Sequence, residues 1–355
     1  MSSPSPFLRH AWYVAGWDHE VTHQPRASRV LGQDLVLYRD EGGRPAALED
    51  LCPHRSLPLS MGRVRGGAIE CGYHGLCFDR TGACVHMPGV ERIPKAVHVR
   101  SFPAESRYGL VWVWMGPPAA ADPRTIFPVV HWDEAGWGRN EGGSMTLECD
   151  YRHVNDNLLD PSHVAWVHRG SFGNTACEDR PVETTETPGG VIASRWMDDV
   201  PVAPFYRTFV GFAGHCDRLQ HYEVRFPSHA LIRAIFVPAG AAGAQAEAHP
   251  QAMIMDSYNF MTPQDADHTR YYWFQIRNFA PYDAIVSRQL DVGIEAAFAE
   301  DKVILNAVHR GHRGRFAPAI ALPGDRAGIL FRRRLQALIE AEQPAATALS
   351  AKPVS

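Results

Sequence analysis

The sequence has no apolar run that approaches eighteen residues, so no segment is long enough to cross a lipid bilayer as a helix. Residues 1–17 hold no seven-residue apolar core ahead of a small-residue cleavage site, and we therefore expect no signal peptide. The motif Gly-x-Gly-x-x-Gly, which binds dinucleotides when it follows a strand, does not occur either. These absences predict a cytoplasmic protein that depends on another chain for any nicotinamide chemistry.

An excess of charge is also lacking. The 35 basic and 39 acidic residues give a formal net charge of −4, which offers no reason to expect a nucleic acid or an anionic membrane as partner. The length of 355 residues allows two domains, and 45% hydrophobic content suffices for their cores. The seven cysteines are an odd number. Five of them suggest only small buried side chains in a reducing compartment: Cys77, Cys84, Cys149, Cys177 and Cys216.

The most informative residues form two short motifs, Cys52-x-His54 and, after sixteen intervening residues, Cys71-x-x-His74. A Rieske [2Fe–2S] centre needs two thiolates on one iron and two imidazoles on the other. A structural zinc site can use the same four side chains. Zinc ligands more often come as a Cys-x-x-Cys knuckle followed by a histidine pair, whereas here cysteine and histidine alternate within each motif. The pattern therefore favours the iron–sulfur cluster.

The chain divides near residue 120. Between Arg29 and Pro88, short apolar runs alternate with turn signals, which predicts a small antiparallel β unit closed by a strand at Leu110–Trp114. Gly116–Pro123 has the composition of a linker. We therefore place a Rieske-type domain at residues 7–117 and a second domain at residues 118–350.

The second domain is predicted to combine β-strands with helices, which makes the whole chain α+β. A short helical segment is expected around Cys149–His168, and two longer helices at about Tyr282–Val308 and Ala327–Glu342. Strands are expected in between, at Leu219–Phe226, Ala230–Val237 and Tyr271–Ile276.

A second set of metal ligands is suggested by His163 and His168. Residues five apart lie about 140° apart on an ideal helix, so the two rings can share one ion only if the helix is deformed or ends between them. Pro161 can deform the helix, and Gly170 can end it after His168. Asp160 falls between the two histidines on the same wheel, where it could accept a hydrogen bond from an imidazole. Two unrelated surface histidines and a helix-capping Asp160 remain the alternative.

The third ligand is predicted from the helix at Tyr282–Val308. Its apolar residues fall within about 80° of one another on the wheel: Leu290, Ile294, Phe298, Leu305 and Val308. Asp301 lies inside this stripe and Glu300 lies off its edge. A buried carboxylate is costly unless it is paired or bound to a metal, so Asp301 is the expected ligand. Two histidines and one carboxylate form the facial triad of non-haem Fe(II) oxygenases; a plain ion pair with an arginine is the alternative.

At this point the chain resembles the Rieske non-haem iron aromatic-ring oxygenases over nearly its whole length. The motifs are Cys-Pro-His-Arg at 52–55, Cys-x-Tyr-His-Gly at 71–75, Asn-Leu-x-Asp-x-x-His-x-x-x-x-His at 157–168, and Glu-Asp at 300–301. Within the family it looks most like the vanillate O-demethylase oxygenase components and the related dicamba and toluenesulfonate monooxygenases. The stretches behind this finer resemblance are Ala11–Ala15, Met87–Gly89, Cys149–Arg152 and Arg277–Ala280.

The resemblance implies an antiparallel β Rieske domain followed by a helix-grip domain, in which helices grip an antiparallel sheet. It also implies a homotrimer in which the cluster of one subunit lies near the iron of its neighbour. An aspartate matching Asp160 would bridge a Rieske histidine to an iron histidine, and Asn157 begins the same motif, so both are candidate catalytic residues. Electrons would come from NAD(P)H through a separate flavin and ferredoxin-type reductase.

The function that this implies is hydroxylation of a methoxy or methyl group of an aromatic acid by O2 at a mononuclear Fe(II). With a vanillate-like methoxy substrate, the product breaks down to a phenol and formaldehyde. An aromatic-ring cis-dihydroxylase with the same metal centres is the alternative. A pure electron-transfer Rieske protein is a third possibility, against which the long second domain with its own iron ligands argues.

Three residues are candidates for the substrate pocket. Asn259 matches a pocket position of a related oxygenase that has histidine there, and Val292 matches one where relatives carry larger or polar side chains. Both differences weaken a specific vanillate assignment. Arg233 could hold the carboxylate of an aromatic acid with two parallel hydrogen bonds, although a strand arginine is more often paired within the protein.

Overall fold

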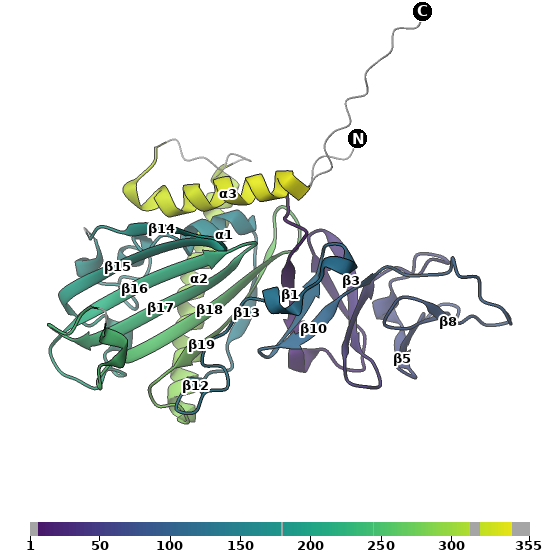
Figure 1. Ribbon diagram of the computed structural model, residues 1–355, viewed down its shortest axis with the longest axis horizontal. Helices are drawn as coiled ribbons and strands as arrows, with labels where there is room; N and C mark the ends of the chain where they lie inside the picture. The colour runs from purple at the N-terminus through teal and green to yellow at the C-terminus, as the bar shows by residue number, and fades with distance from the viewer. Residues whose placement is uncertain (1–5, 179, 244, 313–319, 343–355) are drawn as a thin grey trace, which may run out of the picture.

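The computed structural model describes residues 6–178, 180–243, 245–312 and 320–342. The molecule is elongated, with three small sheets at one end and a large sheet with three helices at the other (Figure 1). The boundary expected between residues 117 and 118 stays a prediction, and the expected domain end at residue 350 lies outside the described residues.

The N-terminal unit begins and ends in one sheet. β1 (Trp12–Trp17) pairs antiparallel with β11 (Leu110–Trp114), and β10 (Ala104–Arg107) continues on the other side of β11. The strand predicted at Leu110–Trp114 is therefore present with the same bounds. All five of its residues are buried, as a short run of Leu, Val and Trp in a central strand should be.

Two further antiparallel sheets carry the rest of this unit. One contains β2 (Arg26–Val30), β3 (Gln33–Arg39), β4 (Pro45–Glu49) and β9 (Ser101–Phe102). The other contains β5 (Arg63–Arg65), β6 (Ala68–Glu70), β7 (Cys77–Phe78) and β8 (Cys84–His86). Gly66 and Gly67, which join β5 to β6, have φ values of 59° and 70°, the left-handed pair that a tight hairpin turn requires.

The second unit is built on one antiparallel sheet of eight strands (Figure 1). Its order is β12-β19-β18-β17-β16-β15-β14, and β13 also pairs with β19. The bounds are β12 (Gly138–Arg139), β13 (Gly143–Leu147), β14 (Glu183–Thr187), β15 (Gly190–Pro201), β16 (His215–Arg225), β17 (His229–Pro238), β18 (Met253–Pro263) and β19 (Thr269–Arg277). The three predicted strands correspond to β16, β17 and β19, whereas β15 and β18 were not predicted.

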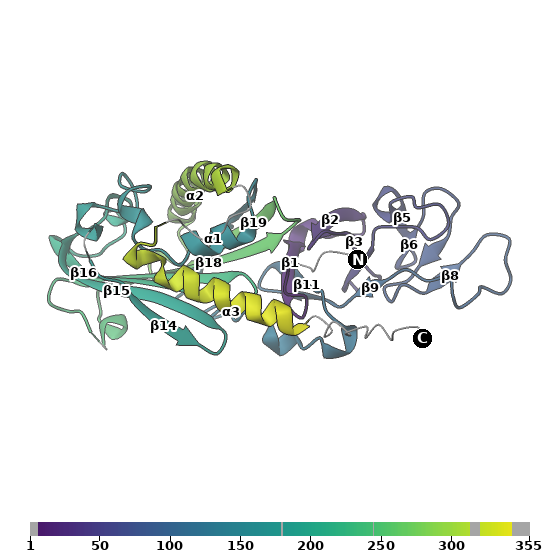
Figure 2. The same cartoon turned by 90° about the horizontal axis from the view of Figure 1, so that it is seen from above.

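Three helices pack on this sheet: α1 (Tyr151–Asn157), α2 (Ala284–His312) and α3 (Arg326–Glu342). Figure 2 shows α1 and α2 on one side of the sheet, and α3 runs along β14 and β15. The two long helices were predicted to within four residues at each end. Helices that grip an antiparallel sheet confirm the predicted fold class. Among the described helices, none is long and apolar enough to cross a membrane.

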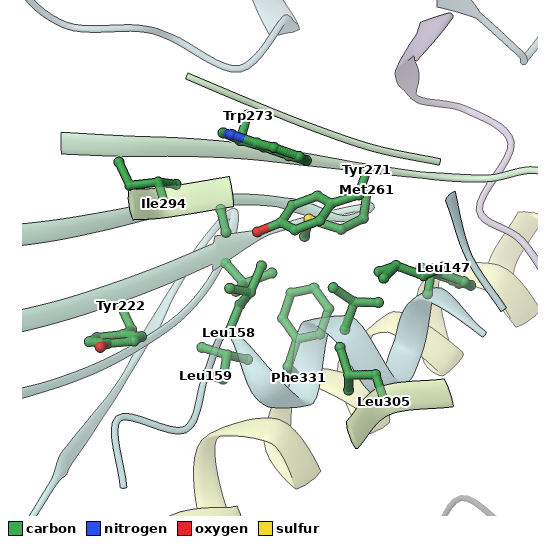
Figure 3. Packing of buried hydrophobic residues seen from close by; sticks show 14 of the residues in the cluster. Leu147, Leu158, Leu159, Tyr222, Met261, Tyr271, Trp273, Ile294, Leu305 and Phe331 are labelled. Carbon is green, nitrogen blue, oxygen red and sulfur yellow. The ribbon is translucent and has the colours of Figure 1, made fainter. Parts of the chain in front are cut away.

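One hydrophobic cluster joins the helices to the sheet. Figure 3 shows Ile294 and Leu305 of α2, Phe331 of α3, and Met261 and Tyr271 of the sheet in this cluster. All five are buried. Because α2 lies against the sheet through these side chains, the polar residues on the same side of α2 face the interior as well.

Candidate metal centres and the adjoining cavity

The two loops with the cysteine and histidine motifs share one backbone geometry. The N–H of Cys52 donates to the carbonyl of Leu57 at 2.9 Å, and the N–H of Cys71 donates to that of Leu76 at 2.8 Å. In each loop the fourth residue after the cysteine has a positive φ, 57° and 72°, and its N–H returns to the cysteine carbonyl. Two matching turns therefore hold Cys52 and Cys71 in equivalent positions, whereas His54 is the second residue after its cysteine and His74 is the third.

The four side chains of these loops differ in burial. Cys52 and Cys71 are each 2% exposed, and both thiols are free. His54 and His74 are exposed, with ring centroids 4.5 Å apart. An inner pair of thiols and an outer pair of adjacent imidazoles fits the donor set of a Rieske cluster. The two histidines are also placed where another protein surface can approach them.

A second group of ligands comes from the segment after α1 and from α2. The ligand atoms of His163, His168 and Asp301 all lie within 4.8 Å of one another. Nε2 of His168 is 3.2 Å from Oδ2 of Asp301, and Nε2 of His163 is 3.8 Å from Oδ1. Two imidazoles and a carboxylate that converge in this way fit a divalent iron with open coordination positions.

The local backbone explains how the two histidines meet. α1 ends at Asn157, and His163 begins a separate 3-10 turn (η5, His163–Ala165) that ends before His168. The two rings therefore do not share a helical surface, and their centroids lie 5.3 Å apart. The expected interruption, a helix that is deformed or ends between the histidines, takes the form of α1 ending before both of them and a 3-10 turn ending between them.

The second nitrogen of each imidazole is held by an acceptor. Nδ1 of His163 contacts the backbone carbonyl of Asp160, and Nδ1 of His168 lies 2.7 Å from Oε2 of Glu300. When each Nδ1 carries the proton, each Nε2 is free to bind a metal and its ring is fixed in orientation.

The electrostatics of this group favour a cation. Asp301 is 6% exposed, and one of its oxygens accepts a hydrogen bond from Nδ2 of Asn157 at 3.2 Å. Burial alone would lower the pKa of His168, but hydrogen bonds and charge from Asp301 and Glu300 outweigh it, so this pKa is raised. A divalent metal ion satisfies the same demand for positive charge beside a buried carboxylate.

Two details of the sequence interpretation need correction. Asp160 does not lie between the histidines on a continuous helix, because α1 ends before it. Its carboxylate Oδ1 accepts from the N–H of Ser162 at 2.8 Å and so caps the following turn. Val308, expected in the buried stripe of α2, is 37% exposed. The bridging role of Asp160 involves a neighbouring subunit and stays a prediction.

Glu300 is a candidate functional residue that the helical wheel missed. It lies off the apolar stripe, and its side chain is 50% exposed, as expected. A glutamate at the edge of a helix face can nevertheless reach inward, and its carboxylate contacts the ligand His168. Its position next to Asp301 was the only signal in the sequence.

A cavity adjoins the candidate iron site, and the three ligands line it. Leu158, Ile294 and Phe298 form apolar parts of its wall on the helix side. The sheet side adds further side chains from β16, β17 and β18: Arg218, Gln220, Tyr222, Ile232, Met255 and Ser257. Figure 3 shows Leu158, Ile294 and Tyr222 around this part of the core. None of the β16 residues was predicted for the site.

Arg233 borders the cavity, but its guanidinium is engaged elsewhere. Nε and Nη2 donate to the two carboxylate oxygens of Asp256 at 2.7 and 2.8 Å. The two residues are direct partners across the β17–β18 ladder. The predicted role of Arg233 as a two-pronged clamp for a substrate carboxylate is therefore corrected, because Asp256 already takes that position.

Val292 and Asn259 do not line the cavity. Val292 is 64% exposed, since nine residues before Asp301 corresponds to the opposite side of α2. Asn259 is fully buried, and its Oδ1 accepts a hydrogen bond from the hydroxyl of Tyr271 at 2.8 Å. Both predicted pocket positions are therefore corrected.

Two family models match the chain. The Rieske [2Fe-2S] domain matches residues 11–103, and the vanillate O-demethylase oxygenase C-terminal domain matches residues 147–341. The first contains both cluster loops, and the second contains all three ligands of the candidate iron site.

Individual proteins match over nearly the full length. The vanillate O-demethylase oxygenase subunit of Pseudomonas sp. strain HR199 is 36% identical over 353 residues, which covers 96% of this chain and 98% of that protein. The iron-sulfur subunit of the toluene-4-sulfonate monooxygenase system of Comamonas testosteroni is 36% identical over 307 residues, or 85% and 88% of the two chains. The structure of dicamba monooxygenase bound to 3,6-dichlorosalicylic acid superposes with a TM-score of 0.87 at 30% identity, covering 95% and 98%.

The cluster loops lead to a prediction about metal content. We expect the protein as isolated to hold about three irons and two acid-labile sulfides per chain, without stoichiometric zinc. Cys71→Ser should lose the sulfides and the visible absorption, because a hydroxyl is a poor ligand for an iron–sulfur cluster. Cys84→Ser, outside the two loops, should keep both. Iron and sulfide analysis checks this, and zinc without sulfide in the wild type would contradict it.

The contact between Glu300 and His168 leads to a second prediction. Glu300→Ala should weaken binding of the mononuclear iron roughly 10- to 100-fold, because the ligand ring loses its acceptor. Asp301→Ala should lose that iron altogether, and both variants should keep the cluster absorption. Glu295→Ala, on the exposed side of α2, is the matched control. Iron retention against a chelator series is the measurement, and equal retention in Glu300→Ala and Glu295→Ala would show that the contact has no role.

Proposed function

The chain belongs to the Rieske non-haem iron oxygenases, in the group of O-demethylases and monooxygenases, and we propose that it hydroxylates a methoxy or methyl group of an aromatic acid. For a vanillate-like methoxy substrate the reaction is O-demethylation. The observation that carries the proposal is that His163, His168 and Asp301 line the same cavity as a largely apolar wall. An aromatic ring in that cavity would lie beside the three residues that would hold the iron.

The chemistry balances as a monooxygenation. One oxygen atom of O2 enters a C–H bond of the methoxy group, and the other leaves as water with a pair of electrons and a pair of protons. In the resulting hemiacetal, the bond between the methylene carbon and the oxygen attached to the ring breaks. The products are formaldehyde and a phenol. When bound, the mononuclear iron and the cluster supply O2 activation and electron storage.

The protein residues position the reactants. Asn157 and Glu300 hold a ligand carboxylate and a ligand imidazole in place through the contacts described above. Leu158 and Ile294 face the cavity and give the ring apolar surroundings. The names of the relatives support an aromatic acid as substrate, since they include vanillate and toluene-4-sulfonate.

Electron delivery requires other chains. In Figures 1 and 2 the sheet β5–β8, next to the cluster loops, lies at the far end of the molecule from α2. This separation supports a cyclic homotrimer in which the cluster of one subunit serves the iron of the next. The exposed His54 and His74 suit such a contact. The electrons stored in the cluster come from NAD(P)H through a separate flavin and ferredoxin-type reductase.

Product analysis tests the reaction. With a compatible reductase and NADH, we expect one or more methoxylated aromatic acids to release formaldehyde, and a methylated aromatic acid to give a benzylic alcohol with a single 18O from 18O2. His168→Ala should give neither product, because the iron site loses a ligand. A ring cis-diol with two 18O atoms and no formaldehyde would contradict the proposal and identify a dihydroxylase.

The proposed transfer between subunits gives another prediction for Asp160. Asp160→Asn removes the charge with little change of size, and we expect it to keep both metal centres and the trimer. Its cluster should be reduced normally but reoxidised far more slowly with substrate and O2, as single-turnover stopped-flow spectroscopy would show. Glu178→Gln, after the same segment, serves as control. Wild-type reoxidation in Asp160→Asn would leave Asp160 as a turn cap only.

A further inference from the structure

Arg218 is a buried cation that has no counter-ion in the part of the chain that the structure describes. It lies on β16, lines the cavity and is 3% exposed. Among the described residues it forms no ion pair, and its one hydrogen bond is a weak contact of Nη1 with the Cys177 sulfur at 3.8 Å. Its Nε has no hydrogen-bond partner. A charged group in such a place is costly unless something else compensates it.

Two aromatic rings hold the guanidinium in position. Its central carbon lies 5.4 Å from the ring centroid of Tyr206 and 5.0 Å from that of Phe236. Contacts with ring faces leave the N–H groups at the edge of the guanidinium unsatisfied. Tyr206 offers no negative charge in return, because burial raises the pKa of its hydroxyl to about 12.

The guanidinium groups of the two neighbouring arginines have acceptors within the protein. Arg233 is paired with Asp256. Arg195 donates to Gln220 Oε1 and to three backbone carbonyls. Among the described residues, Arg218 alone of these three has no oxygen acceptor, only the Cys177 sulfur.

Arg218 therefore adds an uncompensated positive charge to the sheet side of the cavity wall. Among the described residues that line the cavity, only Asp301 carries a carboxylate, and it belongs to the iron site. The side chains of β16 and those of the iron site come from different sides of the cavity, the sheet and the helix side. An aromatic acid fits this arrangement with its acid group at β16 and its methyl or methoxy group toward the iron ligands.

We propose that Arg218 binds the carboxylate of the aromatic substrate and so selects acids over neutral rings. This rests on the proposed function for the identity of the ring substrate, and it adds the residue that recognises its acid group. A guanidinium edge matches a carboxylate with two parallel hydrogen bonds, which neither lysine nor a neutral side chain reproduces.

The test compares two probes of nearly equal shape, 3-methoxybenzoate and its neutral analogue 3-methoxybenzamide. Binding to the holoenzyme is measured by titration calorimetry without reductase, so that the result does not depend on turnover. We expect the wild type to bind the acid at least roughly 10-fold more tightly than the amide. Arg218→Met should weaken acid binding by about 10- to 100-fold and leave amide binding nearly unchanged. Arg218→Lys should fall between the two.

The control is Arg207→Met, which removes an exposed arginine close to the same aromatic residues and should keep the wild-type preference. Cluster absorption and iron content verify that each variant is folded. If Arg218→Met does not fold, the acid-to-amide ratio of the wild type and of Arg218→Lys decides. Equal binding of the two probes by the wild type, or failure to bind the acid at millimolar concentration, would overturn the proposal.

The outcome for Arg218 is separable from that for the reaction. A preference for the acid that disappears in Arg218→Met supports the anchor even if no formaldehyde is formed, in which case only the proposed reaction fails. Formaldehyde release with an unchanged acid preference in Arg218→Met would instead overturn the anchor and leave the reaction intact.

Discussion

The buried carboxylate of Asp301 between two imidazoles is the interaction on which the rest of the second domain depends. Taking this carboxylate out of water is costly, so α2 must hold it close to compensating groups. Polar contacts fix α2 on both sides of it. Asp291 accepts from the N–H of Gly142 at 3.0 Å, and Asn306 accepts from the N–H of Glu148 at 2.9 Å. Because the two donors, Gly142 and Glu148, flank β13, the helix cannot slide along the sheet without losing these bonds.

The position of α2 also determines where the helix side of the cavity wall lies. A Cβ at Gly293 would lie 2.2 Å from the ring of Phe205, so only glycine allows this approach. Phe205 in turn packs on Phe172 with ring centroids 4.2 Å apart, and Phe172 meets the ring of His168 edge-on at 6.3 Å. A continuous series of packed rings thus connects the helix that supplies the carboxylate to a histidine ligand. Close packing at Gly293 therefore matters for metal geometry, although this residue touches no ligand.

The metal ligands could be predicted from the sequence, because each set of ligands is encoded by a short motif or by the pattern of one helix. The cluster ligands lie in two short loops, and the apolar stripe of one helix identified Asp301. Features that depend on pairing between distant strands were missed: Arg233 meets Asp256 only through the β17–β18 register. β18 (Met253–Pro263) itself gave no strand signal, because all eleven residues are buried and polar side chains interrupt its apolar ones. The prediction that Val292 lines the pocket was wrong for another reason, because the helical period puts this residue on the side of α2 opposite Asp301.

The distribution of charge around the cavity then suggests how selectivity arises. Arg218 supplies positive charge to the cavity wall, and a metal ion held by His163, His168 and Asp301 would supply more beside Asp301. An acid group can neutralise only the first, because the second already has its own carboxylate. A neutral ring bound in the same place would cover Arg218 without offering it an acceptor, and so would bury an unpaired cation. Rejection of such a ring requires no steric clash, since the unsatisfied charge itself discriminates between the two ligands.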